Sequence, residues 1–157
     1  MDIEHGDSIR TEQGPSRDGS FLCLAMAARL LGSSADHAQL VRAWPPGPYP
    51  ELTLLRAAKS LGLKARRTQG TKDRLEGLPT MGIALMDDGA HVLVIKTMPG
   101  KVLIYDPRDG KGDGTVADRP SLVDAAEFKE AWSGEIIPIL PIRRRLVHPA
   151  LRPQLMP

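Results

Sequence analysis

A dense apolar segment near the N-terminus, residues 18–31, restricts the fold of this chain more than any other feature. In its sequence, DGSFLCLAMAARLL, Arg29 is the one clearly polar residue beyond the first three positions. Apolar residues on nearly every side predict a helix that is buried on most of its surface. Asp18 or Ser20 can cap its start, and Gly32 can end it. We therefore expect a central helix against which the other elements pack.

The bulk properties indicate one soluble domain. The 157 residues are 41% hydrophobic, 25% charged and 4% aromatic, with a net charge of +2. This length supports one core, and the small charge and scarce aromatic residues give no sign of nucleic-acid binding. One cysteine excludes an internal disulfide and fits a reducing compartment. The sequence has neither a signal peptide nor an apolar run long enough to cross a bilayer, so we expect a cytoplasmic location.

The order of the predicted elements indicates the fold class. Helices are expected at residues 36–44, with Asp36 as cap, and 51–61, with Leu52, Leu55, Ala58 and Leu61 on the buried face. Strands are expected at 64–69, 80–86, 91–97, 101–106 and 135–142, a helical turn at 72–76, and a helix from Ser121 to Trp132. Pro138 and Pro141 restrict the last strand to a sheet edge. Helices followed by antiparallel strands predict an α+β fold.

The C-terminal residues 143–157, RRRLVHPALRPQLMP, are basic, rich in proline and without periodicity. This composition is typical of a linker. The three arginines fit a cytoplasmic membrane face or the start of a membrane-spanning region absent from this chain, and a solvated tail is the alternative. We therefore divide the chain into a domain, residues 1–142, and a linker, residues 143–157.

A histidine and an aspartate fall at the ends of two neighbouring predicted strands. His91 follows the hairpin signal Asp87-Asp88-Gly89, and Asp106 ends the next strand. If these strands pair symmetrically about Pro99-Gly100, His91 and Asp106 lie nearly opposite each other. A carboxylate in that place fixes the tautomer of the imidazole and supports the imidazolium. Taken alone, such a pair is more often incidental than functional.

Four stretches together resemble one family. The string DGSFLCLAM, residues 18–26, resembles the D-C-G-x-x-C-L-x-M opening of the C39 peptidase domains, papain-like modules at the N-termini of ABC transporters that export and trim peptides. Residues 91–94 and 102–107 resemble the histidine strand and the aspartate–proline strand of that family, and residues 54–67 resemble the helix-to-strand segment between the motifs. The resemblance covers about residues 13–142. It implies a papain-like cysteine-protease fold with N-terminal helices packed on an antiparallel sheet.

The main departure from that family is Gly19, which stands where the nucleophilic cysteine is expected. The resemblance implies that Gln13 is the relic oxyanion donor, His91 the relic base and Asp106 the relic orienting carboxylate. Covalent catalysis needs a thiolate or alkoxide beside the base, and removing it costs about a millionfold in turnover. Cys23 lies one helical turn further along, and we expect a packing residue with an inert thiol. Ser20 is the better candidate for a substitute nucleophile, but its side chain points about 100° around the helix from position 19.

A domain of this kind without its cysteine resembles the C39-like domains of type I secretion (hemolysin-type) ABC transporters. That resemblance implies a catalytically inactive domain that binds an unfolded RTX-type polypeptide at the cytoplasmic side of the bacterial inner membrane. The implied partners also include the membrane and nucleotide-binding domains of its own transporter. The implied substrate-binding residues are Gly19, Ser20, Leu85, His91 and Asp106. Leu85 stands where several members have an aromatic residue that packs on the histidine, so ring stacking on His91 is not expected.

Two alternative functions remain open at this point. One is an active C39 peptidase that cleaves double-glycine leader peptides, with Gly19 as an engineered replacement of cysteine or Ser20 as nucleophile. The other is a free-standing interaction domain unconnected with export. Separately from these alternatives, we expect Arg66 and Arg67 to lie on a face of the protein that is exposed to solvent.

No cofactor or metal is expected. Asp106, Asp109 and Asp113 miss the EF-hand spacing, and no glutamate closes the loop. The glycines match no phosphate-binding loop. His5, His37 and His148 are far apart in sequence and have no cysteine partners, so they predict no zinc site.

Overall fold

The structure, a computed structural model, describes residues 19–33, 36–45, 48, 50–69, 72–78, 80–109 and 119–142. Gln13, Asp18 and the predicted linker 143–157 lie outside the described residues.

Helices and strands follow one another in the order expected for an α+β domain. The helices are the first helix (residues 19–30), α2 (His37–Ala43), α3 (Pro50–Ser60), the 3-10 helix η1 (Lys72–Gly77) and α4 (Ala125–Ala131). The strands are β1 (Leu63–Ala65), β2 (Thr68–Gln69), β3 (Gly82–Met86), β4 (His91–Met98), β5 (Lys101–Tyr105), β6 (Ser121–Asp124) and β7 (Trp132–Pro141). Every pairing between the strands is antiparallel, in the order β1-β7-β3-β4-β5-β6, with β2 also on β7. The predicted α+β class is confirmed.

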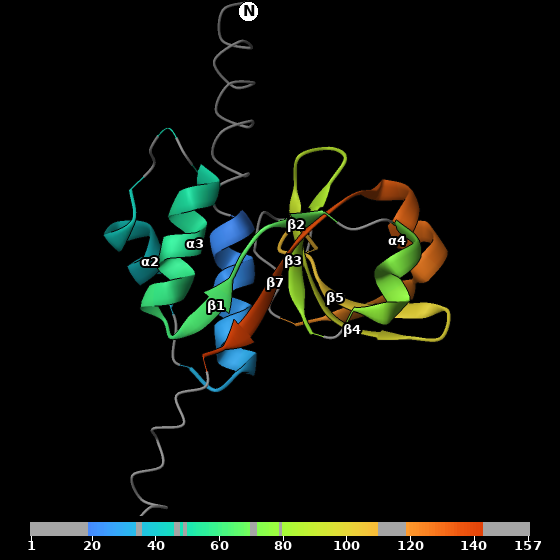
Figure 1. The fold of residues 1–157 in the computed structure, drawn as a ribbon, viewed down its shortest axis with the longest axis horizontal. Coiled ribbons are helices and arrows are strands. Elements are labelled where there is room, and N and C mark those ends of the chain that lie inside the picture. The colour runs from blue at the N-terminus through green and yellow to red at the C-terminus, as the bar shows by residue number, and fades with distance from the viewer. Residues whose placement is uncertain are drawn as a thin grey trace, which may run out of the picture.

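The sheet carries an apolar core on each face. The core on one face joins the sheet to the first helix, α2 and α3, and includes Phe21, Leu24, Leu54, Ile83 and Leu93. The core on the other face joins it to η1 and α4, and includes Leu75, Val92, Phe128, Trp132 and Ile136. Figure 1 shows the first helix, α2 and α3 grouped on one side of the molecule and α4 on the other. β1 and the end of β7, which pair with each other, lie beside the first helix (Figure 1).

The first helix is the buried element that its sequence predicts. Cys23, Leu24, Ala27 and Ala28 are each 0% exposed. Gly32 has a φ of +91°, and the Ser33 N–H donates to the Ala28 carbonyl at 2.7 Å. This 6→1 bond with a left-handed glycine before its donor is a Schellman motif, so Gly32 ends the helix as predicted.

The predicted helix before β1 is confirmed, and so is most of its predicted buried face: Ala58 is buried, Leu55 and Leu61 are half-buried against the core, and Leu52 alone differs. Leu54, Ala57 and Ala58 of α3 are buried, whereas Leu52 is 42% exposed. The first helix and β1 approach α3 from the side of Leu54, which leaves Leu52 outside the core. Asp36 stands at the N-cap position of α2, but its side chain makes no capping hydrogen bond. The assignment of Asp36 as a side-chain cap is therefore wrong.

The helix predicted from Ser121 to Trp132 is wrong in its first part. Ser121–Asp124 form β6, which pairs with β5, and α4 begins only at Ala125. The predicted strand 64–69 is also divided into β1 and β2.

The final strand is not at an edge, contrary to the prediction from its prolines. β7 lies between β3 on one side and β1 and β2 on the other. The Ile139 N–H donates to the Met81 carbonyl, so the backbone of Pro138 faces the opposite neighbour. On that side of β7, β1 pairs with Ile139–Pro141 and β2 pairs with Glu135 and Ile136. The missing N–H of Pro138 therefore falls in the gap between β1 and β2. An interior strand thus accommodates a proline where its partner changes.

Candidate functional site

The first helix packs directly on the start of β4. The Cys23 thiol donates a weak hydrogen bond to the carbonyl oxygen of His91, with the sulfur 3.6 Å away. Cys23 is fully buried, and burial raises the pKa of its thiol well above the ordinary value, with a further rise from the Asp106 carboxylate. A thiol with a raised pKa is a poor nucleophile, so the prediction that Cys23 is a packing residue is confirmed.

Gly19 lies one helical turn before Cys23 and on the same side of the helix. It is partly exposed, and no atom of the described residues lies within 4 Å of the place that a Cβ atom would take. The position therefore has room for a side chain. Ser20 is different, because only 7% of it is exposed. Little of Ser20 is accessible to a substrate.

His91 is the first residue of β4 and lies on the face of the sheet that turns toward the first helix. Side chains two residues apart on a strand share a face, and Leu93 belongs to the core that contains Cys23. Leu85 of β3 pairs directly with His91, and Glu135 of β7 pairs directly with Leu85. The three residues therefore form a row across β4, β3 and β7, which we call the His91 row. Leu85 and His91 are half-buried, and the Nδ1 atom of His91 is buried.

Asp106 follows β5 directly, but the β4–β5 hairpin does not pair symmetrically, which was the condition for Asp106 to lie nearly opposite His91. The β4–β5 hairpin pairs Met98 with Lys101, but its register shifts between Val94 and Lys96, so that Leu93 pairs with Tyr105. If this register continued, Asp106 would face the residue after His91. The Asp106 carboxylate is near enough to Cys23 for its charge to act on the thiol. Gly19, His91 and Asp106 are thus brought to one region at the first helix, while Gln13 lies outside the described residues.

Arg108 is the main hydrogen-bond donor to Asp106 among the described residues. Its Nε and main-chain N–H both donate to Asp106 Oδ1 at 3.0 Å, and Nη2 donates to Oδ2 at 2.9 Å. Its Nη1 donates to Asp88 Oδ2 at 3.0 Å, in the hairpin between β3 and β4. Hydrogen bonding to Asp106 raises the pKa of Arg108, and burial with the Asp106 charge raises the pKa of Asp109. No motif in the sequence points to this cluster.

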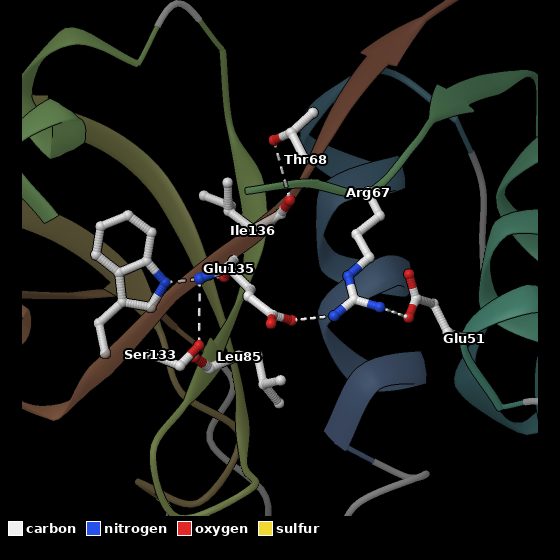
Figure 2. Close-up of polar contacts among 8 residues, drawn as sticks. Glu51, Arg67, Thr68, Leu85, Ser133, Glu135 and Ile136 are labelled. Atoms are coloured by element: carbon white, nitrogen blue, oxygen red, sulfur yellow. Dashed lines mark hydrogen bonds and ion pairs between the residues drawn. The ribbon is translucent and has the colours of Figure 1, made fainter. Parts of the chain in front are cut away.

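A second arginine lies at the other end of the His91 row. Arg67 donates to Glu51 of α3 at 2.8 Å and also to Glu135 of β7, and Figure 2 shows its guanidinium between the two carboxylates. These bonds raise the pKa of Arg67, with the hydrogen bond to Glu135 as the largest cause. Glu135 is held on its own strand by the Ser133 hydroxyl, which accepts from the Glu135 N–H and donates to the Leu85 carbonyl (Figure 2). The interpretation of Arg67 as a solvated residue is therefore incomplete, since it joins the helical part to the sheet.

The described residues contain no group of three or more histidine, cysteine, aspartate or glutamate side chains that could hold a metal ion. The loop with Asp113 lies outside that part of the chain. Within the described ranges, no helix is both long enough and apolar enough to cross a membrane. The chemical groups at hand are therefore an imidazole, a carboxylate held by a guanidinium, and an open helix position without a nucleophile.

Comparison with known proteins finds relatives by sequence and solved structures with the same fold. The chain is 32% identical over 123 residues to the cyclolysin secretion/processing ATP-binding protein CyaB of Bordetella pertussis, a match that covers 76% of this chain and 16% of that protein. It is 36% identical over 85 residues to the leukotoxin export ATP-binding protein LtxB of Aggregatibacter actinomycetemcomitans, covering 53% of this chain and 11% of that protein. The chain thus spans about a sixth or less of the length of these relatives.

Solved structures with the same fold include a double glycine motif protease from an AMS/PCAT transporter, in complex with the leader peptide. Its TM-score is 0.64 at 17% identity, covering 78% of this chain and 84% of that chain. The N-terminal peptidase C39 like domain of a toxin secretion ATP-binding protein from Vibrio parahaemolyticus has a TM-score of 0.59 at 18% identity, covering 81% and 96%. At these identities the likeness confirms the fold. The model of the Peptidase C39 family matches residues 9–142, so this chain is a member of the Peptidase C39 family.

Proposed function

We propose that this chain is a catalytically inactive C39-like domain that binds an unfolded secreted polypeptide for export by a type I secretion ABC transporter. The observation that carries the proposal is a glycine at position 19, on the side of the first helix that packs on the start of β4. In a family of cysteine peptidases, this position corresponds by sequence motif to the nucleophile. A glycine has no atom that can attack a peptide carbonyl.

The surroundings of Gly19 supply no replacement nucleophile among the described residues. Cys23 is fully buried with a raised pKa, and Ser20 is 7% exposed. Acyl transfer needs a nucleophile within hydrogen-bond reach of the base and open to the substrate carbonyl. Both side chains fail the second requirement. This geometry supports inactivity and counts against cleavage of leader peptides through Ser20.

Binding of an extended polypeptide is supported by the half-buried His91 row. Leu85 offers an apolar contact and His91 a polar one, side by side on adjacent strands. A papain-like fold that held an extended peptide can keep its binding surface after its nucleophile is lost. An unfolded chain loses conformational freedom when it binds, so we expect a Kd in about the micromolar range or weaker.

The relatives suggest the wider context. CyaB and LtxB are named for cyclolysin secretion and leukotoxin export, and both are ATP-binding proteins. By analogy, the partners of this domain are the membrane and nucleotide-binding domains of its own transporter, at the cytoplasmic side of the inner membrane. Residues 143–157 would then be the linker toward the membrane domain, and residues 1–142 the domain itself.

The proposal is tested by titrating the ¹⁵N-labelled domain with cyclolysin that has been diluted from urea and is still unfolded. We expect amide shifts at Leu85, His91 and their neighbours, with saturation in about the micromolar range. Reduced and carboxymethylated ribonuclease, which is unfolded but not secreted by such a transporter, should shift them less. Absence of shifts at the His91 row with unfolded cyclolysin would contradict the proposal.

A matched pair of variants localises the binding. Leu85→Ser removes the apolar contact of the His91 row, and Leu122→Ser removes a leucine on β6 that is 52% exposed and outside that row. We expect the first change to weaken binding about tenfold and the second to leave it unchanged. Equal effects of the two changes would mean that the polypeptide binds elsewhere.

A further inference from the structure

Arg108 holds the Asp106 carboxylate by a planar, two-pronged contact. Nε and Nη2 of one guanidinium reach the two oxygens of one carboxylate, and the Arg108 main-chain N–H reaches one of them again. Such fork-to-fork pairs are among the strongest and most directional hydrogen bonds in proteins. The Asp106 side chain is 11% exposed, so water competes little for its oxygens. Asp106 is therefore committed to Arg108.

The same guanidinium also fixes the hairpin that leads into His91. Nη1 of Arg108 donates to one oxygen of Asp88, and the other Asp88 oxygen accepts the Ala90 N–H at 3.0 Å. The Ala90 N–H and, next, the Arg108 side chain lower the pKa of Asp88. Arg108 thus joins the end of β5 to the residues directly before His91, so it can set both the carboxylate and the backbone beside the imidazole.

We propose that Arg108 is a positioning residue that withdraws the Asp106 carboxylate from His91, so that the site is disabled at a second point besides the lost nucleophile. An orienting carboxylate helps a histidine base because its negative charge stabilises the imidazolium. A carboxylate paired with a guanidinium presents almost no net charge. His91 beside the Arg108–Asp106 pair is then a weaker base than His91 beside a free carboxylate. This inference rests on the proposed function in one respect, the role of Asp106 as the relic orienting residue.

Other charged and titratable groups near His91 can also affect its titration. They include Cys23 of the first helix, Glu135 across Leu85 in the His91 row, and Asp88 and Asp109 around Arg108. Glu135 is paired with Arg67 and Asp88 with Arg108. Since these groups remain in place when Asp106 or Arg108 is changed singly, a cycle of two substitutions isolates the effect that passes through Asp106.

The test is an NMR titration of the His91 imidazole in four proteins: wild type, Arg108→Gln, Asp106→Asn and the double variant. The His91 signal is assigned by its loss in His91→Gln. We expect Arg108→Gln to move the titration midpoint upward by about one pH unit, the usual effect of an unpaired neighbouring charge. In the Asp106→Asn background the same change should have less than half that effect. Lys101→Gln, which breaks the ion pair with Asp124, is the matched control and should leave the midpoint in place.

Two results would overturn the inference. Equal shifts in both backgrounds would mean that Arg108 acts on His91 only as a distant positive charge. No shift in either background would mean that Arg108 serves the hairpin alone. Should Arg108→Gln fail to fold, Arg108→Lys keeps a charge but loses the fork, and we expect a smaller upward shift that again depends on Asp106. Because this readout involves neither polypeptide binding nor hydrolysis, its outcome is independent of the test of the proposed function.

Discussion

Two arginines lie at opposite ends of the His91 row, and each one joins two carboxylates. Arg108 joins Asp106 to Asp88, and Arg67 joins Glu135 to Glu51. The two arginine side chains are equally exposed, at 52% and 51%. The carboxylates differ in one respect: Asp106 is 11% exposed, whereas Glu135, Glu51 and Asp88 are 26%, 39% and 61% exposed.

This difference in exposure indicates that the two arginine–carboxylate clusters have different roles. Sheltered from water, Asp106 depends on its guanidinium, so the Arg108 cluster has one preferred geometry beside His91. The Arg67 cluster is open to solvent, where ion pairs contribute little to stability and are easily rearranged. It lies where the helical part meets β2 and β7, so it can open at small cost. The end of the row near His91 is fixed, and the other end is adaptable.

The largest expected effect comes from a thiol probe at the fixed end. Gly19→Cys places a sulfur one turn from the buried Cys23, at a position where a Cβ atom has no neighbour within 4 Å among the described residues. We expect position 19 to react with iodoacetamide at least about 100 times faster than Cys23, whose pKa is raised by burial. Mass spectrometry of digested protein measures both sites in one sample. Equal protection of the two thiols would show that the site is closed.

Next in size is the stability difference between the two arginines. Arg108→Gln leaves a sheltered carboxylate without its fork, and we expect a loss of about 1 kcal/mol in the free energy of unfolding after allowance for solvent screening. Arg67→Gln is the matched change, and its effect should be smaller. Urea unfolding of both variants makes the measurement. A larger loss for Arg67 would reverse the comparison.

A smaller effect should appear on adding salt. Ion pairs in water are screened within about 8–10 Å at ordinary ionic strength and more strongly above it. In 0.5 M NaCl, we expect the effect of Arg67→Gln on the urea midpoint to disappear and that of Arg108→Gln to remain for the most part. Parallel losses of both effects would indicate that the two clusters are equally exposed to solvent.

The smallest expected effect is on the free energy of unfolding at acid pH. The pKa of Asp88 is lowered in the folded state, first by the Ala90 N–H and then by Arg108. A lowered folded-state pKa means that Asp88 stabilises the fold above its unfolded pKa and that this contribution is lost as the pH falls below about 4. Asp88→Asn should therefore cost about 0.5 kcal/mol or less at pH 7 and a smaller amount at pH 3, by urea unfolding. A cost that grows toward pH 3 would contradict the sign.

Features set by local chemistry were predictable from the sequence. Gly32 ends the first helix, and the turn at Asp87–Gly89 leads into β4 at His91, because turn and cap residues act within a few positions. Ser121 illustrates the limit. It is a favourable cap residue, but pairing with β5 places it in a strand. A propensity was overridden by a partner distant in sequence.

The residues of the candidate site were chosen from the sequence and remain a prediction, and the hydrogen bonds around them could not be predicted. His91 and Asp106 stand out by their places at strand ends, and the motif identifies Gly19. The contacts of Arg108 depend on the register shift near Ile95, which has no sequence signal, and on the Asp87–Gly89 hairpin, whose turn was predicted but whose side-chain contacts were not. The Arg67 bridge likewise depends on α3 and β7 meeting across the break between β1 and β2.

The central claim is that this member of a peptidase family has lost its nucleophile and does not cleave peptide bonds. Its most direct test is mass spectrometry of a double-glycine leader peptide after long incubation with the purified chain. We predict that the peptide remains intact, at the level of a sample without protein. Cleavage after the double glycine that disappears in Ser20→Ala would contradict the account.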